Sequence, residues 1–148
     1  MTTLRGEVLV DGEAGKGEAL VLTAPISFWG GVDPRSGCIR DVRHPQHGAG
    51  IAGKVLFLPD TIGSSSASAV LLELVPAGHA PAAIAMHEPD AILLLGLIVA
   101  REMGWRAPIA VQLDRARFAR FRQHGTARRL GDVASSYLPY LEEAIAAE

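Results

Sequence analysis

The sequence predicts a single α/β domain, and three observations support that prediction. The chain has 148 residues, which is the usual size of one domain, and it shows no internal repeat or linker. Its apolar fraction of 49% is enough to build a hydrophobic core and argues against a disordered chain. Between Lys54 and Leu113, apolar strand patterns alternate with helical patterns, which is typical of parallel strand–helix–strand units.

The first third of the chain is predicted to be rich in β-structure. Apolar and polar side chains alternate over residues 4–10, which predicts a strand, and residues 18–23 predict a second strand. The glycine-rich residues 11–17 between them predict a flexible turn. A loop then covers residues 24–50, and loops longer than about 15 residues are uncommon unless they are functional or disordered. Because this loop contains two aromatic residues and two histidines, we expect it to be ordered and functional.

The parallel half follows, and we expect the β-rich N-terminal part to pack against it. The segment Pro76-Ala77-Gly78-His79 is expected to end its first helix, and Gly104 its second. The predicted strands cover residues 54–58, 82–86 and 107–113, and the predicted helices cover residues 64–75 and 88–103.

The remaining residues give a weaker pattern. Residues 114–124 predict a helix, residues 126–130 a strand, and residues 137–147 a terminal helix.

Charge, hydropathy and cysteine content exclude several classes of function. The net charge of −2 gives no global sign of nucleic acid or membrane binding, so neither partner is expected. The most apolar stretch, residues 91–100, has half of the roughly 20 residues that a membrane span requires. Residues 1–5 do not resemble the start of a signal peptide. The sequence has one cysteine, Cys38, so an internal disulfide is excluded and a reducing cytoplasm is expected.

The segment Gly63-Ser64-Ser65-Ser66 is the first candidate for chemistry. It lies where a buried strand is expected to lead into a helix, and ligands bind at that end of open α/β sheets. Backbone N–H groups at a helix start favour an anion. A serine there could bind a carboxylate or phosphate, or act as a base if it is ionised. The alternative is an ordinary helix N-cap, for which serine is a preferred residue.

Ionising a serine hydroxyl, which titrates far above pH 7, is costly. Each pKa unit corresponds to about 1.36 kcal/mol. A helix N-terminus supplies at most about 2 kcal/mol, which corresponds to about 1.5 pKa units. A basic serine therefore needs further positive charge from arginines, a metal or a partner chain.

A second candidate is His44-Pro45-Gln46-His47. Two histidines three residues apart could share a metal on a helix, but Pro45 argues against a helix and no acidic or cysteine ligand adjoins them. A loop-fixing or substrate-facing role is therefore favoured over a metal site.

A run of arginines without acidic residues is a third candidate. Such a run is usually a solvated face, but it could also bind an acidic partner. RNA binding is disfavoured by the near-neutral chain and the lack of an RNA-binding motif. The run consists of Arg115, Arg117, Arg120, Arg122, Arg128 and Arg129.

Established catalytic motifs are missing. There is no Walker loop, dinucleotide fingerprint, nucleophile elbow or zinc motif, and no convincing acid–base pair. If this chain is part of an enzyme, other residues must come from elsewhere. A free-standing hydrolase would require a histidine within hydrogen-bond distance of Ser64; the candidates are His44, His47, His79 and His87.

Several segments together resemble one known family. The chain is similar to the swivelling small subunit of aconitase X over roughly residues 4–113. The matching segments are residues 17–22, 25–34 (PISFWGGVDP), 37–48 (GCIRDVRHPQHG), 51–56, 63–66 (GSSS) and 78–84.

The resemblance implies a swivelling β/β/α domain that closes over a larger subunit. That subunit would hold most of the site for a small-molecule substrate. Any iron–sulfur cluster or divalent metal would be held there and not by this chain alone. The reaction implied is a dehydration, catalysed by a hydro-lyase. By position in the family, Ser64 is the base, with Ser65 the alternative, and Gly63, Ser65, Ser66 and His44 contact the substrate.

The chain also departs from the family pattern. Ile62 stands where the family usually has arginine, Ser66 stands where threonine is common, and residues 114–148 are interpreted as a divergent extension. Of the family's two known substrates, the alanine- and arginine-rich, lysine-poor composition favours cis-3-hydroxy-L-proline. The alternatives are 5-phosphomevalonate, or a non-catalytic binding or regulatory domain of the same fold.

Overall fold

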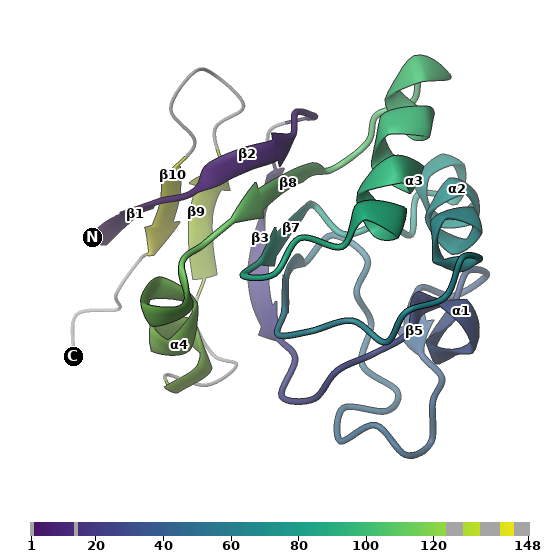
Figure 1. Cartoon of the computed structure of the whole chain (residues 1–148), viewed down its shortest axis with the longest axis horizontal. Coiled ribbons are helices and arrows are strands. Elements are labelled where there is room, and N and C mark those ends of the chain that lie inside the picture. The colour runs from purple at the N-terminus through teal and green to yellow at the C-terminus, as the bar shows by residue number, and fades with distance from the viewer. Residues whose placement is uncertain (1, 14, 124–128, 134–139, 144–148) are drawn as a thin grey trace.

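A computed structural model describes residues 2–13, 15–123, 129–133 and 140–143. Within these residues, an eight-stranded sheet has the order β1-β10-β9-β3-β6-β7-β8-β2 (Figure 1). Helices α2 and α3 pack together beside the sheet, and α4 lies at one of its ends. The N-terminal part supplies β1 (Thr2–Arg5), β2 (Glu7–Val10) and β3 (Gly15–Val21).

The parallel half is confirmed. Strands β6, β7 and β8 pair in parallel, and β3 pairs in parallel with β6. The crossover helices α2 and α3 connect the three strands, as the sequence predicts. The bounds are β6 (Val55–Leu58), α2 (Ala67–Ala77), β7 (Ala83–Met86), α3 (Ala91–Glu102) and β8 (Ile109–Gln112).

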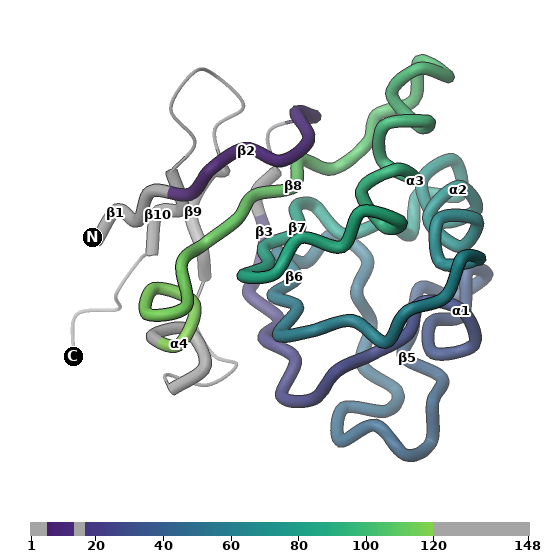
Figure 2. Tube along the Cα trace, viewed as in Figure 1, coloured from purple at the N-terminus to yellow at the C-terminus, as the bar shows by residue number. Residues whose placement is uncertain are grey.

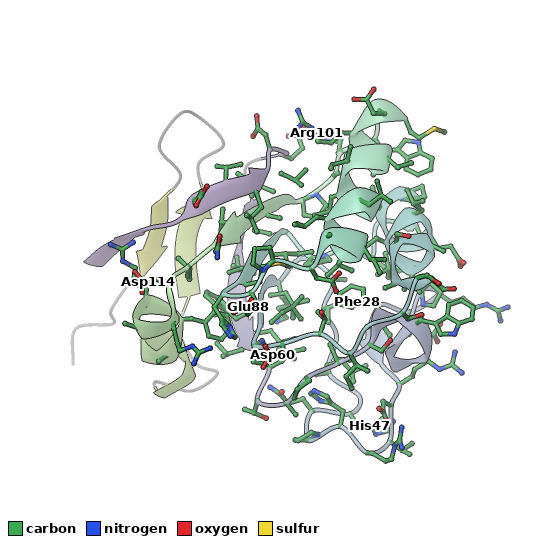
Figure 3. All side chains as sticks on the ribbon, in the orientation of Figure 1. Phe28, His47, Asp60, Glu88, Arg101 and Asp114 are labelled. Atoms are coloured by element: carbon green, nitrogen blue, oxygen red, sulfur yellow. The ribbon has the colours of Figure 1, made fainter. Side chains whose placement is uncertain are left out.

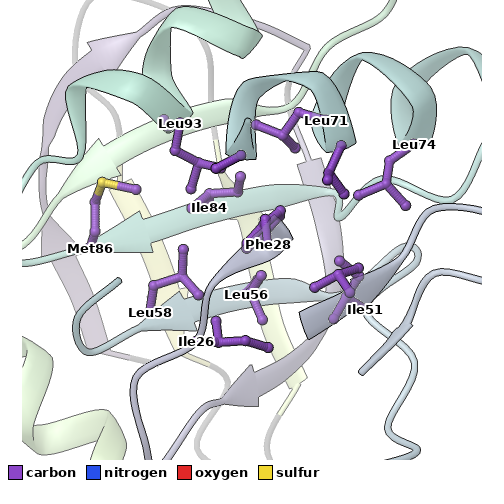
Figure 4. Close-up of a cluster of buried hydrophobic side chains, with 14 of the residues drawn as sticks. Ile26, Phe28, Ile51, Leu56, Leu58, Leu71, Leu74, Ile84, Met86 and Leu93 are labelled. Carbon is purple, nitrogen blue, oxygen red and sulfur yellow. The ribbon is translucent and has the colours of Figure 1, made fainter. Parts of the chain in front are cut away.

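The central strands are buried on both faces, so their side chains alternate between two cores. Leu56 and Leu58 of β6 face the helices and pack with Leu71, Ile84 and other residues (Figure 4). Val55 and Phe57 point to the opposite face and belong to a second cluster with Ile109, Val111 and Phe118. This two-sided burial explains why the three strands read as continuous apolar runs.

The N-terminal segment forms both edges of the strand order. The prediction of one strand over residues 4–10 is wrong, because β1 pairs with β10 while β2 pairs with β8. Gly6 separates the two strands, and a Cβ there would lie 2.9 Å from the carbonyl oxygen of Gln112. A glycine therefore lets the chain pass close to β8 as it changes partner. The first and last strands of the order, β1 and β2, are therefore neighbours in the sequence.

Helix α2 differs from its prediction at both ends. It begins at Ala67 rather than Ser64, and it extends past the predicted end at Val75 to Ala77. Pro76, which has no backbone N–H to donate, therefore lies in the last turn of the helix. The left-handed Gly78 (φ 76°), which is part of the segment expected to stop the helix, ends it.

The C-terminal part contains one further error. Helix α4 (Arg115–Gln123) agrees with the prediction, and β9 (Arg129–Val133) confirms residues 129–130 of the predicted strand and continues to Val133. The predicted terminal helix is wrong over β10 (Tyr140–Glu143), which pairs antiparallel with β1 and β9. Available pairing partners outweigh local helix preference in such a short segment. Residues 126–128, 137–139 and 144–147 of these predictions lie outside the described residues.

The loop over residues 24–50 is ordered, as expected. It contains the single turn α1 (Phe28–Gly31) and a hairpin of β4 (Val32–Asp33) and β5 (Cys38–Ile39), which Figure 2 traces below the sheet. Backbone hydrogen bonds tie its arms together, including Ile39 N to the Ala49 oxygen at 2.9 Å. Among the described helices, none is long and apolar enough to cross a membrane.

Candidate functional site

Polar side chains gather at the carboxyl ends of the parallel strands. Asp60 and Ser64 follow β6, His87 and Asp90 follow β7, and Arg115 follows β8. Because these three strands are parallel neighbours, their following residues meet at one edge of the sheet. Figure 3 shows Asp60 and Glu88 at this edge, close to α4 in the view. This edge is where open α/β sheets bind ligands.

The serine loop is not a simple helix cap. The half-buried Ser64 precedes the helix, and its Oγ accepts a hydrogen bond from the backbone N–H of Ser66 at 3.2 Å. Its carbonyl oxygen accepts from the N–H of Ala67 at 3.1 Å. Ser66 holds the N-cap position, yet its side chain makes no capping hydrogen bond. A Cβ placed on Gly63 would meet nothing within 4 Å, so the loop borders open space.

The two residues that precede Gly63 hold the serine loop in place. The backbone N–H of Ile62 donates to the oxygen of Ile26 at 3.0 Å, and Thr61 forms a β-bridge with Ile26. The hydroxyl of Thr61 donates to Oδ2 of Asp90 at 2.5 Å. The other oxygen of Asp90 caps helix α3 by accepting from the N–H groups of Ile92 and Leu93. Asp90 therefore connects the serine loop to the start of α3.

Position 62 itself is apolar and open to solvent. The side chain of Ile62, which replaces the arginine usual in the resembling family, is 56% exposed. It offers no charge to an anion at the serine loop.

His44 is built into the loop that precedes the site. It is 6% exposed, its Nδ1 accepts from the N–H of Gln46 at 3.0 Å, and its Nε2 donates to the oxygen of Ala24 at 3.0 Å. Gln46 in turn contacts the end of β3, through the oxygen of Val21 and the N–H of Thr23. This geometry supports the loop-fixing interpretation. A direct substrate contact by His44 stays a prediction.

A second group at this edge was not recognised as a group from the sequence, which named His87 and Arg115 separately and did not name Asp60 as a candidate. Asp60, His87 and Arg115 line a cavity together with Pro59, Phe118 and Ala119. Nε2 of His87 lies 3.7 Å from Oδ1 of Asp60. The signal that could have found this group was its position, since each residue follows the end of a parallel strand within three residues.

A free-standing hydrolase requires a hydrogen bond between Ser64 and a histidine, and the described residues do not form one. Among the described residues, Ser64 forms no hydrogen bond to His44, His47, His79 or His87. Exposed His47 lies elsewhere, on the loop that extends below the sheet in Figure 3. A Ser–His nucleophile of the usual kind needs that contact.

The described residues do not offer a metal site. No three His, Cys, Asp or Glu side chains in this part of the chain gather closely enough to hold a metal ion. The single cysteine, Cys38, is a free thiol in β5. The donor side chains of the described residues therefore do not fit a metal ion or an iron–sulfur cluster.

Comparisons with known proteins agree with this fold. Residues 3–134 match the family model of the aconitase X swivel domain. The crystal structure of Thermococcus kodakaraensis aconitase X in its holo-form superposes with a TM-score of 0.81 and 28% identity. That match covers 98% of this chain and 100% of the solved chain.

Two curated relatives are similar to parts of the chain. Cis-3-hydroxy-L-proline dehydratase of Pseudomonas aeruginosa is 52% identical over 103 residues, which cover 69% of this chain but 18% of that protein. The phosphomevalonate dehydratase small subunit of Methanothermobacter thermautotrophicus is 44% identical over 86 residues, covering 58% and 66% respectively. The chain thus spans a small part of the first relative and about two thirds of the second.

Proposed function

Because this chain belongs to the aconitase X swivel domain family, we propose that it is the small subunit of a two-chain dehydratase. The observation that supports this most directly is the serine loop at the carboxyl edge of the sheet. Ser64 presents a half-buried hydroxyl beside open space, without a histidine of the described chain to activate it. A site of this kind is incomplete and requires groups from a second chain.

In the proposed reaction, Ser64 acts as the base. Its ionised oxygen takes a proton from a substrate carbon, the C–H electrons form a carbon–carbon double bond, and a hydroxyl on the neighbouring carbon leaves as water after protonation. The N–H of Ser66, which donates to Oγ of Ser64, stabilises the ionised form of the serine. The N-terminus of α2 adds positive potential, but at most about 2 kcal/mol. The remaining stabilisation is assigned to the large subunit.

We favour cis-3-hydroxy-L-proline as the substrate. The relative of that name is 52% identical, against 44% for the phosphomevalonate dehydratase small subunit, which is the alternative. The proposal assigns any iron–sulfur cluster or divalent metal to the large subunit, where it would supply electrophilic help to the leaving hydroxyl. It also places the enzyme in the cytoplasm, where reducing conditions suit its free cysteine.

Exposed Ile62 favours one further candidate, a non-catalytic domain of the same fold. Co-purification separates it from the dehydratase. The tagged chain should retain an aconitase-X-type large subunit from the same organism, and the mixture should dehydrate cis-3-hydroxy-L-proline while neither chain does so alone. Failure to form a stable complex would favour the non-catalytic domain. Turnover by this chain alone would contradict the two-chain account.

A further inference from the structure

The cavity beside Asp60 is distinguished by its charges. It has a volume of about 280 Å³ and is lined by residues that follow β6 and β7 and by the first part of α4. Phe118, which is 4% exposed, gives it an apolar wall and packs edge-on against Phe57 of the core. The cavity is therefore backed by a fixed part of the domain. Its size lies at the small end of ligand pockets, which suits a ligand of few atoms.

Two opposite charges in this cavity lack a strong partner. Arg115 forms no ion pair within the described residues, whereas its neighbour Arg117 pairs with Asp114 at 3.3 Å. Asp60 is paired with Nε2 of His87 at 3.7 Å, which is too long for a hydrogen bond. An Asp60–Arg115 ion pair is absent from the same part of the chain. Within the described residues, neither charged group is engaged in a close ion pair.

The histidine in the cavity is also incompletely partnered. Its ring packs on Phe118 with centroids 5.2 Å apart, and its buried Nδ1 finds no hydrogen-bond partner among the described residues. Most buried polar atoms in proteins have such a partner, so an exception calls for an explanation. His87 therefore lines the cavity with a ring that the described residues do not fully hydrogen-bond.

From these groups we propose that the cavity binds a small amino or imino acid in its zwitterionic form. The ligand carboxylate accepts hydrogen bonds from the guanidinium of Arg115, and its protonated amine donates to Asp60. The inference rests on the proposed function and deepens it, because it assigns the substrate class to residues of this chain. Asp60 is also the start of the segment that leads to Ser64, so a ligand here lies at the same edge as the serine loop.

The same charges disfavour the phosphorylated alternative. A phosphate monoester carries up to two negative charges, and a substrate such as phosphomevalonate adds a carboxylate. Arg115 would attract these groups, but Asp60 would repel them at short range. A zwitterion satisfies both side chains at once.

Binding to the full chain tests this assignment. The chain is titrated with L-proline, with cis-3-hydroxy-L-proline and with inorganic phosphate, while NMR follows the His87 ring and the Arg115 side chain. The variants are Arg115→Gln and Asp60→Asn, and the matched control is Arg117→Gln, two residues further along α4. We expect both imino acids to bind and each pocket variant to weaken binding about tenfold or more, with the control unchanged.

Several outcomes would overturn the assignment. These are the absence of an NMR shift with either imino acid, binding by Arg115→Gln that equals binding by the wild type, or binding of phosphate without binding of an imino acid. Arg115→Lys, which keeps the charge, guards against a folding defect and should bind more tightly than Arg115→Gln.

Turnover by the mixed enzyme, that is, this chain combined with its large subunit, distinguishes the proposed pocket from the proposed dehydratase function. If turnover occurs and Arg115→Gln leaves KM unchanged, the pocket fails and the dehydratase stands. If imino acids bind as described but no mixture turns over, the dehydratase fails and the pocket stands.

Discussion

His44 and His87 are both largely buried, and they differ in what their ring nitrogens contact. His44 uses both nitrogens, one as a donor to Ala24 and one as an acceptor from Gln46. In the part of the chain that the structure describes, Nδ1 of His87 has no hydrogen-bond partner, and its Nε2 lies 3.7 Å from Oδ1 of Asp60. The first ring belongs to a loop that supports β3, and the second lines a cavity at the carboxyl edge. Complete partnering indicates a structural role for His44, whereas the incomplete partnering of His87 leaves that ring less tightly bound to the fold.

The largest expected effect is on the stability of the His44 loop. His44→Ala leaves the oxygen of Ala24 and the N–H of Gln46 without their partners in a partly buried setting. We expect the free energy of unfolding to fall by about 2–4 kcal/mol. Urea denaturation measures this, with exposed His47→Ala as the control. A loss for His44→Ala no larger than that of the control would refute the structural assignment.

Asp90 provides a second test, because it is fully partnered like His44 but lies at the functional edge. Asp90→Ala removes the cap of α3 and the acceptor for Thr61, and should cost about 1–2 kcal/mol. Thr61→Val keeps the cap and removes the connection to the serine loop, so it should cost about 1 kcal/mol. In the mixed enzyme, Thr61→Val should lower kcat and leave KM nearly unchanged. Unchanged turnover would show that the connection does not position Ser64.

His87 should behave differently from His44. His87→Phe keeps a ring against Phe118 and removes an already unpartnered nitrogen, so stability should change by less than about 1 kcal/mol. The same denaturation series measures it. A loss as large as that of His44→Ala would mean that His87 is structural and that the comparison between the two histidines is wrong.

The smallest effect concerns Asp41, in the loop that contains His44. The backbone N–H of Arg43 lowers the pKa of Asp41 from its ordinary value of 3.8. A lowered pKa in the folded state gives stability that is present above the unfolded pKa and lost as pH falls through the folded value. Wild type should therefore lose slightly more stability than Asp41→Asn as the pH falls below about 4. Identical pH profiles for the two proteins would contradict this shift.

The pattern of apolar and polar residues predicted those parts of the fold that short segments of sequence determine. The apolar runs at residues 54–58 and 82–86 are buried on both faces, and the loop over residues 24–50 is ordered. The terminal helix was wrong because strand pairing with β1 and β9 decides the structure of residues 140–143. The split at Gly6 depends on a close approach to Gln112, which no local pattern shows.

Only the part of the candidate site that is continuous in sequence could be predicted. Gly63-Ser64-Ser65-Ser66 is continuous in sequence, so its place after a strand was visible. Asp60, His87 and Arg115 are far apart in sequence and meet because three parallel strands end together. Whether His44 fixes a loop or contacts a substrate also depended on partners 20 residues away.

Turnover by Ser64→Ala in the mixed enzyme tests the central claim most directly, with Ser65→Ala as the matched control in the same loop. If Ser64 is the base, kcat should fall about 100-fold or more, while complex formation and substrate binding remain. Ser65→Ala should keep most of the activity. Full turnover by Ser64→Ala with unchanged binding would contradict the account, and loss confined to Ser65→Ala would move the base to the neighbouring serine.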